Sequence, residues 1–494
     1  MGLGLLTLVS VGKENIYLST EPDITYFKIA YKRYSNFSIE TVAQYFKTIP
    51  DFGRRVTVNI SKNADLLGAC YLYVKLPDII TSNHSTLPNG IKKFSWAKKI
   101  GLTLLRYVDL EISGILIERN FGDWLNIWYE LTISLGKKKA YNKMIGDIEL
   151  LTEYTNGKTS YGLNIPFNFW FCQDTGLTLP LIAMTHNDIK FHIEFSDFNL
   201  CFKESPTHYI KIKEPFCLYK SNEIIKQTVN NNIAVGSFVY YNSVNQYIYY
   251  NKIKGDFIIP SDINQKYLLI GSQTKFEVNL EINSLLVKDE SYFRFNTPSI
   301  LSASILVNYI YLDNEERFHF LTKSHQYLIP TVQTITEQPS YSINFSYKIP
   351  FINPNKIIFW RSILMSNITA NNNFDYSLYP LTDTDDNIIE KSQIILNSIQ
   401  RTEVINSDSY STLQIYMNKF YSSQKGIYMY SFCLNPLDYQ PSGSCNFSQI
   451  DDTYLQITLN KKINYQNPIY IKAYGIQYNL FRVSNGLGGL GFFM

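Results

Sequence analysis

Apolar and polar residues alternate along most of the chain with a period of two. In residues 189–195, for example, Ile, Phe, Ile and Phe alternate with Lys, His and Glu. An apolar side chain at every second position is typical of an antiparallel strand with one face on a core and the other in water. Comparable runs occupy residues 56–61, 71–76, 108–113, 342–349, 455–460 and 469–474. Many short strands separated by turn residues predict an all-β protein built from sandwiches or jelly rolls.

Three segments depart from this period. Between Trp124 and Leu135 apolar residues recur at helical spacing, which predicts a helix inside a long connection between strands. The polar residues 314–318 follow a strand-like run and predict a second helical turn, in a linker between two domains. Residues 205–298 are rich in Asn, Lys, Tyr and Ile and contain strand-like pieces, so we expect an ordered insertion there.

Length and composition fit this picture. The 494 residues suffice for two all-β domains, and the 39 Tyr and 31 Phe favour pleated sheets and apolar contacts between proteins. The net charge of +3 lacks the basic excess of a protein that coats nucleic acid, so we expect no direct nucleic-acid contact. The chain has no apolar run of about 18 residues, which is the length that a membrane-spanning helix needs.

Candidate chemistry is sparse. The six cysteines have no Cys-x-x-Cys spacing; their even number permits three disulfides, but a chain of this size favours reduced, buried thiols. A jelly-roll metal enzyme would need a His-x-His pair with a further Glu and His, which the sequence lacks. Ser442 lies in Pro-Ser-Gly-Ser, which favours a turn over a nucleophile elbow. We therefore predict no catalytic residues, no cofactor and no metal. Six Asn-x-Ser/Thr sequons leave glycosylation open.

Several blocks of the sequence resemble a known family. Residues 17–28 (YLSTEPDITYFK) and 31–40 (YKRYSNFSIE) are similar to the opening of major capsid proteins of nucleocytoplasmic large DNA viruses, with Thr20 in place of the usual Gly and Lys32 in place of an Arg. Blocks at 179–183, 311–318, 325–329, 426–432, 440–451 and 478–490 follow in the family's order. The resemblance spans most of the chain and leaves the insertion and parts of the second half unmatched.

The resemblance implies a double jelly roll, that is, two consecutive eight-stranded jelly rolls with short helices in long loops. The domains expected from it are an N-terminal arm at 1–24, a first roll at 25–313 with the insertion at 205–298, a linker at 314–328, a second roll at 329–485 and a glycine-rich C-terminal arm at 486–494. The positions that the resemblance marks as structural are Pro22, Phe27, Asn36, Phe37, Arg317, Pro441, Gly443, Asn446, Gly488 and Gly489.

The same resemblance implies a structural function without catalysis. Three copies would form a homotrimer, a pseudo-hexagonal capsomer that tiles an icosahedral virion capsid assembled in the host cytoplasm. Its partners would be neighbouring capsomers, minor capsid or cement proteins and an internal viral membrane at the inner face. Two alternatives remain open from the sequence: a lower-abundance capsid paralogue, and a jelly-roll attachment or carbohydrate-binding protein.

Overall fold

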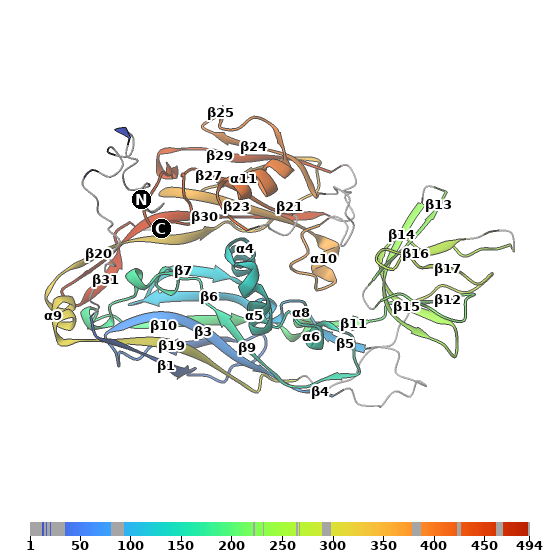
Figure 1. The fold of residues 1–494 in the computed structure, drawn as a ribbon, viewed down its shortest axis with the longest axis horizontal. Coiled ribbons are helices and arrows are strands. Elements are labelled where there is room, and N and C mark those ends of the chain that lie inside the picture. The colour runs from blue at the N-terminus through green and yellow to red at the C-terminus, as the bar shows by residue number, and fades with distance from the viewer. Residues whose placement is uncertain are drawn as a thin grey trace, which may run out of the picture.

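The structure, a computed structural model, describes residues 35–80, 93–220, 223–230, 232–262, 265, 267–288, 298–377, 387–421, 426–460 and 468–492, together with residues 12, 13, 16 and 20. Two β sandwiches lie one above the other, and a separate sheet stands to one side of them (Figure 1). Pro22 and Phe27, and nearly all of the arm expected at 1–24, lie outside the described residues.

The first sandwich is a jelly roll of two four-stranded sheets. One sheet has the order β1 (Phe37–Tyr45), β19 (Ser302–Leu312), β3 (Leu66–Leu76) and β9 (Tyr161–Pro166). The other has the order β2 (Arg55–Asn59), β10 (Ile189–Phe195), β6 (Leu105–Ile112) and β7 (Ile115–Phe121). All neighbouring strands are antiparallel, and alternate residues such as Leu72, Val74, Phe191 and Ile193 fill the core between the sheets. The predicted alternation is confirmed in this roll.

The predicted helix around Trp124 is present, with different bounds. Helices α4 (Gly122–Thr132), α5 (Leu135–Ile145) and α6 (Glu149–Thr152) all lie between β7 and β9. Ile133 adopts extended backbone angles, so α4 stops there and Leu135 begins the next helix. Short elements complete the connections of this roll: β4 (Ile79–Ile80), β5 (Lys93–Trp96), β8 (Gly157–Lys158), β11 (Phe202–Ser205), α3 (Ile100–Leu104), α7 (Trp170–Gln173), α8 (Phe198–Cys201), η1 (Thr175–Leu177) and η2 (Leu181–Ala183).

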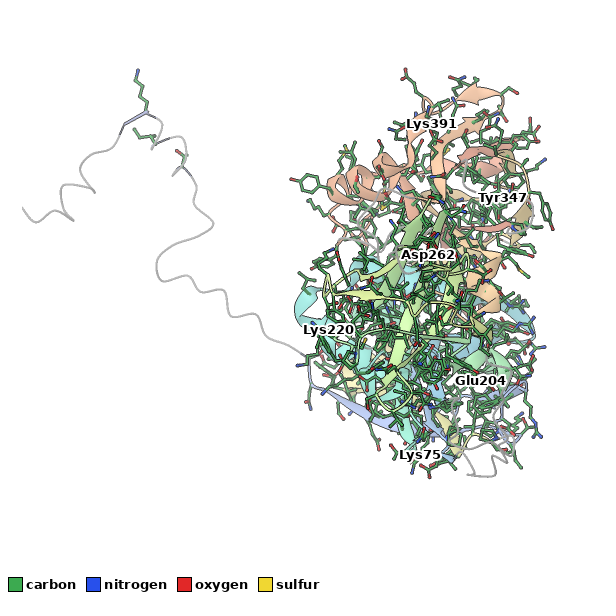
Figure 2. The ribbon with its side chains drawn as sticks, turned by 90° about the vertical axis from the view of Figure 1, so that its right-hand side faces the viewer. Lys75, Glu204, Lys220, Asp262, Tyr347 and Lys391 are labelled. Atoms are coloured by element: carbon green, nitrogen blue, oxygen red, sulfur yellow. The ribbon has the colours of Figure 1, made fainter. Side chains whose placement is uncertain are left out.

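A seven-stranded sheet lies between β10 and β19 in the chain. Its order is β17 (Glu277–Asn279), β16 (Leu268–Gly271), β13 (Ile224–Val229), β14 (Asn232–Asn242), β15 (Tyr247–Lys254), β12 (His208–Lys211) and β18 (Val287–Lys288). It has its own apolar cluster, which includes Ile210, Phe238, Ile248 and Leu269. Seen from the side, this sheet stands in front of the two sandwiches (Figure 2).

The second sandwich repeats the strand order of the first. One sheet runs β20 (His325–Thr334), β30 (Ile469–Ser484), β23 (Pro354–Leu364) and β27 (Ile427–Ser431); the other runs β22 (Asn344–Lys348), β29 (Thr453–Leu459), β24 (Ile389–Leu396) and β25 (Ile399–Gln400). The remaining elements are β21 (Gln338–Ser340), β26 (Ile405–Asn406), β28 (Cys445–Asn446), β31 (Leu487–Leu490), α10 (Met365–Thr369), η3 (Ser409–Leu413), α11 (Gln414–Met417) and η4 (Phe447–Gln449). The fold is therefore all-β with two jelly rolls, as predicted.

Helix α9 (Asn314–Thr322) joins the two rolls at the predicted junction. The Asp313 carboxylate accepts from the Glu316 amide at 3.0 Å, which caps the helix start. Arg317 reaches back to the first roll, with its Nε 3.2 Å from Oδ1 of Asp65. Strand β20 begins at His325, so the linker is shorter than the expected 314–328.

Most of the glycine-rich end, which the sequence predicted as a C-terminal arm at 486–494, is paired within its own chain. Residues 487–490 form β31, which pairs with β30 in the same chain. The Gly488 amide donates to Oδ1 of Asn187 at 2.6 Å, and the Gly488 carbonyl accepts from the Asn187 side chain at 3.1 Å. Glycine permits this close approach because a Cβ at Gly488 would lie 3.0 Å from the Met184 side chain. The segment thus ties the second roll to the first.

Strand β30 departs from the predicted one-sided pattern. Ile469, Ile471 and Ala473 face the core of the second roll, as expected, but Lys472 and Tyr474 on the other face are buried as well. The reason is that this sheet lies between two apolar layers, its own core and the first roll. A strand covered on both sides loses the alternation that marks a half-exposed strand.

Candidate functional site at the interface of the two rolls

Helix α4 of the first roll packs on the outer face of the sheet β20-β30-β23-β27. Its Trp124 is fully buried, with ring centroids 5.7 Å from Phe359 on β23 and 5.3 Å from Tyr474 on β30. Residues of both rolls belong to one continuous apolar cluster across this contact. Aromatic pairs of this kind add to the free energy of burying their area. The contact therefore holds the two rolls as one body.

Charged side chains meet at this apolar contact: Arg361 and Lys472 are buried, and Asp123 and Glu337 are partly exposed. Asp123, at the start of α4, lies between Arg361 of β23 and Lys472 of β30: Nη2 of Arg361 is 2.8 Å from Oδ2, and Nζ of Lys472 is 3.0 Å from the same oxygen. Nη1 of Arg361 also binds Oε1 of Glu337 at 2.6 Å. Nζ of Lys472 lies 3.8 Å from the ring centroid of Phe121, where a cation is attracted to the aromatic face.

The neighbouring positive charges favour the ionised form of Asp123. Burial alone would raise the pKa of Asp123, but the charges of Lys472 and Arg361 outweigh it and hold that pKa well below its ordinary value. Burial lowers the pKa of Lys472, and the charge of Asp123 acts against that shift. A buried charge without its partner is costly, so each of the three side chains depends on the others. We call Asp123, Arg361, Lys472 and Glu337 the buried ion cluster.

Glu118 of β7 is a second buried carboxyl at this interface. Burial raises the pKa of Glu118 well above its ordinary value, and the backbone of Val332 on the second roll opposes the shift to a smaller extent. Its Oε2 atom has no hydrogen-bond partner among the described residues. A group whose pKa is raised on folding stabilises the folded state below its unfolded pKa and loses that contribution as the pH rises.

We therefore expect Glu118→Gln to be more stable than the native chain at neutral pH. The difference in the free energy of unfolding should grow from about pH 4.5 upward, by no more than about 1.4 kcal/mol per pH unit. Denaturant unfolding at a series of pH values measures it. Glu390→Gln, at an exposed position on β24, is the matched control for the Glu-to-Gln exchange and should change the free energy of unfolding by no more than about 0.5 kcal/mol. A pH-independent difference for Glu118→Gln would contradict this explanation.

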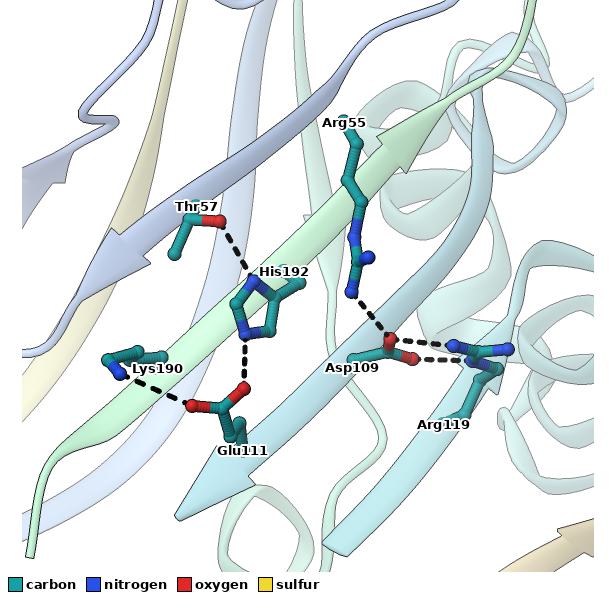
Figure 3. A network of polar contacts seen from close by, with 7 residues as sticks. All are labelled: Arg55, Thr57, Asp109, Glu111, Arg119, Lys190 and His192. Carbon is teal, nitrogen blue, oxygen red and sulfur yellow. Dashed lines mark hydrogen bonds and ion pairs between the residues drawn. The ribbon is translucent and has the colours of Figure 1, made fainter. Parts of the chain in front are cut away.

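The outer face of the sheet β2-β10-β6-β7 carries a polar network that could be mistaken for an active site (Figure 3). Asp109 accepts from Arg119 in two hydrogen bonds, of 2.6 and 2.8 Å, and lies 3.5 Å from Arg55. Asp109 on β6 and Arg119 on β7 are opposite each other on neighbouring strands, where opposite charges stabilise a sheet, and Arg55 lies on β2, two strands away from β6. The guanidinium groups of Arg119 and Arg55 both bind the Asp109 carboxylate, so this carboxylate is poorly placed to act as a base toward a substrate.

His192 forms the second half of this network. Its Nδ1 lies 2.8 Å from Oγ1 of Thr57, and its Nε2 lies 2.8 Å from Oε2 of Glu111, whose other oxygen is 3.3 Å from Nζ of Lys190 (Figure 3). Burial would raise the pKa of Glu111, but the hydrogen bonds from His192 and Lys190 lower it overall. Both ring nitrogens of His192 are engaged, and we interpret the network as cross-strand stabilisation.

Further chemistry is scarce in the described part of the chain. No group of three His, Cys, Asp or Glu side chains there could hold a metal ion, and no described helix is long and apolar enough to cross a membrane. All six cysteines are free thiols, as the sequence indicated. Burial raises the pKa of the Cys201 thiol, which keeps it protonated and unreactive.

The late family block forms a turn on the second roll. Oγ of Ser442 accepts from the Asn435 amide at 2.9 Å, and Oδ1 of Asn446 accepts from the Ser448 amide at 3.1 Å. Gly443 has a φ of +136°, in a region that disfavours a side chain. Pro441 is exposed in the same turn. These residues therefore shape a loop and do not converge on a ligand.

The other positions marked by the resemblance are spread over the molecule. Asn36 precedes β1 and Phe37 begins it, both exposed. Arg317 lies at the junction helix, while Gly488 and Gly489 lie in β31. The structure thus brings Gly488 against the first roll but does not gather the set into one site. The buried ion cluster was missed, although Arg361 and Lys472 are single charges inside apolar runs, which is the signal that could have revealed them.

Comparisons with known proteins agree with this fold. A family model described as the N-terminus of major capsid proteins matches residues 25–250, and one described as the large eukaryotic DNA virus major capsid protein matches residues 316–489. The probable capsid protein 4 of Acanthamoeba polyphaga mimivirus is 32% identical, over 100% of this chain and 99% of that protein. The major capsid protein of Pyramimonas orientalis virus is 28% identical, over all of both chains.

Solved structures show the same fold. The Faustovirus major capsid protein superimposes with a TM-score of 0.66 at 11% identity, covering 96% of this chain and 94% of that one. The capsid protein in a quasi-atomic model of the PBCV-1 virus capsid gives a TM-score of 0.64 at 20% identity, covering 95% and 100%. The relatives are structural capsid proteins, which confirms the expectation that the chain is not an enzyme. The chain belongs to the major capsid protein family of large eukaryotic DNA viruses.

Proposed function

We propose that three copies of the chain form a homotrimeric capsomer of pseudo-hexagonal outline, and that these capsomers tile the icosahedral shell of a virion assembled in the host cytoplasm. The observation that carries the proposal is that the chain contains two rolls with the same strand order, packed against each other through one shared apolar cluster. Three such pairs supply six similar lobes, and a closed threefold ring limits growth to a discrete block.

The interface between the rolls supports this function physically. A shell subunit must keep its two lobes at a fixed angle, because neighbouring subunits contact both of them. The apolar contact around Trp124 and the buried ion cluster fix that angle, and β31 adds a second tie. In a shell, neighbouring capsomers, minor capsid or cement proteins and an internal membrane at the inner face would be the partners, and nucleic acid would not be contacted directly.

The mass of the purified chain in solution tests the proposal. One chain has a mass of 57.3 kDa, so light scattering should give about 172 kDa for three copies. A well-folded particle of 57.3 kDa at every concentration tested would contradict a homotrimer that assembles unaided.

A further inference from the structure

A lysine of the first roll meets an asparagine of the second roll at the base of the insertion. Lys203 lies in β11, shortly before the seven-stranded sheet, and its Nζ donates a hydrogen bond to Oδ1 of Asn372. Asn372 follows α10, which lies beside α8 and β11 in Figure 1. The two residues are 169 positions apart, so they meet only because the two rolls are packed together.

The turn that carries Asn372 is fastened to the first roll. Nδ2 of Asn371 donates to the carbonyl oxygens of Asn199 and Phe202, at 2.8 and 2.7 Å. Phe374, in the same turn, is buried in the apolar cluster that the two rolls share. The carboxamide and the amine therefore keep their relative positions in the folded chain.

The amine of Lys203 loses its proton more easily than an ordinary lysine. Burial lowers its pKa from 10.5 to about 8; the charge of Asp375 acts against this shift, and the charge of Lys98 adds to it. At neutral pH about a tenth of the amine is then uncharged, compared with about 0.03% for an ordinary lysine. In the part of the chain that the structure describes, Nζ has no carboxylate within salt-bridge distance. An uncharged lysine amine is a nucleophile.

We propose that Lys203 and Asn372 become joined by a covalent isopeptide bond once the chain has folded. Nζ of Lys203 attacks Cγ of Asn372, a new amide bond forms between these two atoms, and the bond from Cγ to Nδ2 breaks. The proton that Nζ loses passes to Nδ2, which departs as ammonia. One amide replaces another, so the reaction needs no oxidant and no cofactor, and the escape of ammonia into water draws it forward.

The fold supplies the rate that this reaction lacks between free molecules in water. Groups that are held in a reactive arrangement behave as if present at about 10⁵–10⁸ M. Asp375 lies in the same turn as Asn372, its charge acts on Lys203, and it relays the proton from Nζ to Nδ2. Its Oδ1 accepts from the amide and the hydroxyl of Ser377, at 3.1 and 2.6 Å, which fixes the carboxylate. Hydrogen bonds that serve proton transfer often tighten only as the reaction proceeds.

The bond would add a covalent connection to the contacts that hold the two rolls together. It joins the base of the insertion to the second roll, and an amide, unlike the buried ion cluster, does not weaken with salt or with a change of pH. The inference goes beyond the proposed function and does not depend on it, because the bond forms within one chain.

The mass of the intact native chain tests the bond. Loss of ammonia should make the purified full-length chain about 17 Da lighter than its sequence requires. Trypsin does not cleave after an acylated lysine, so the digest should contain a branched peptide in which residues 191–211 are joined to residues 362–391. Fragmentation of this peptide should place the junction at Lys203 and Asn372.

Matched variants assign the loss of ammonia to these side chains. Lys203→Arg, whose guanidinium stays charged, and Asn372→Ala should both retain the full mass and give two separate peptides. Lys98→Arg, at an exposed position near Lys203, is the matched control and should still be about 17 Da light. Asp375→Asn keeps the Oδ1 acceptor but cannot carry the proton, so the linked fraction soon after synthesis should fall by at least about tenfold. Circular dichroism verifies that the variants are folded.

The outcomes decide the inference whatever the oligomeric state. A native chain of full mass with two separate peptides would overturn it. A chain about 17 Da light without the branched peptide would overturn it as well, because an asparagine that cyclises onto its own backbone also loses ammonia. A link that persists in Lys203→Arg would show that another lysine reacts. Linking of Asp375→Asn at the native rate would remove the assigned proton relay.

Discussion

Asp123→Asn is expected to lower the free energy of unfolding by about 3–5 kcal/mol, the range found when one partner of a buried ion pair is removed. Asn keeps the shape of the side chain but removes the charge that faces Arg361 and Lys472. Lys472 then has no carboxylate within salt-bridge distance among the described residues. Its side chain is only 10% exposed, so water replaces little of the lost interaction. Equilibrium denaturant unfolding measures the loss.

The matched control is Asp452→Asn on the second roll. Asp452 pairs with Lys348 at 2.8 Å, a distance similar to that in the buried ion cluster, but both side chains are about half exposed. An exposed pair of this kind contributes about 0–1 kcal/mol because water screens it. Similar losses for the two variants would contradict the role assigned to burial in the cluster.

The pH dependence of the difference in stability between the native chain and Asp123→Asn gives an independent check. Because the pKa of Asp123 is lowered on folding, its contribution is present above the unfolded value of about 3.9 and is lost only as the pH falls through the much lower folded value. The native chain should therefore lose its advantage over Asp123→Asn between about pH 5 and the acid limit of the experiment.

Gly122→Ala is expected to destabilise the fold by about 3 kcal/mol or more, at the upper end for overpacking a well-packed core. A Cβ at Gly122 would lie 2.1 Å from the carbonyl oxygen of Leu102 and 2.5 Å from that of Leu105. These are backbone atoms, so α4 would have to move away from α3 and β6, and Trp124 would leave its place between the rolls. Thermal and denaturant unfolding both report the change.

Gly136→Ala is the matched control for this prediction. Gly136 lies in α5, and a Cβ there would meet nothing within 4 Å. Ala is favoured over Gly inside a helix by about 0.5–1 kcal/mol, so this variant should be slightly more stable than the native chain. Opposite signs for the two glycines are the expected result, and a neutral Gly122→Ala would contradict the packing described for α4.

The sequence predicted those elements that show their pattern within a short segment and have one face in the core and the other in water. Strand β10 has one face in the core and one in water, so its alternation is visible in seven residues. The stripe around Trp124 predicted α4 because three helical turns carry the signal. The family resemblance supplied the number of rolls, which alternation alone leaves open.

What the sequence did not predict depends on contacts between distant residues. Strand β30 is buried on both faces because the first roll covers it, and Asp123 meets Lys472 across 349 positions of the chain. Strand β31 was expected as a free arm, since a glycine-rich end carries little local signal, yet its backbone pairs with β30.

The most direct test of the account is an image of the purified trimeric particle by electron microscopy, viewed along its threefold axis. Because each chain holds two rolls side by side in a rigid pair, averaged images should show six lobes of similar size around the centre. A particle with three lobes, or a separated two-lobed monomer, would contradict the pseudo-hexagonal capsomer.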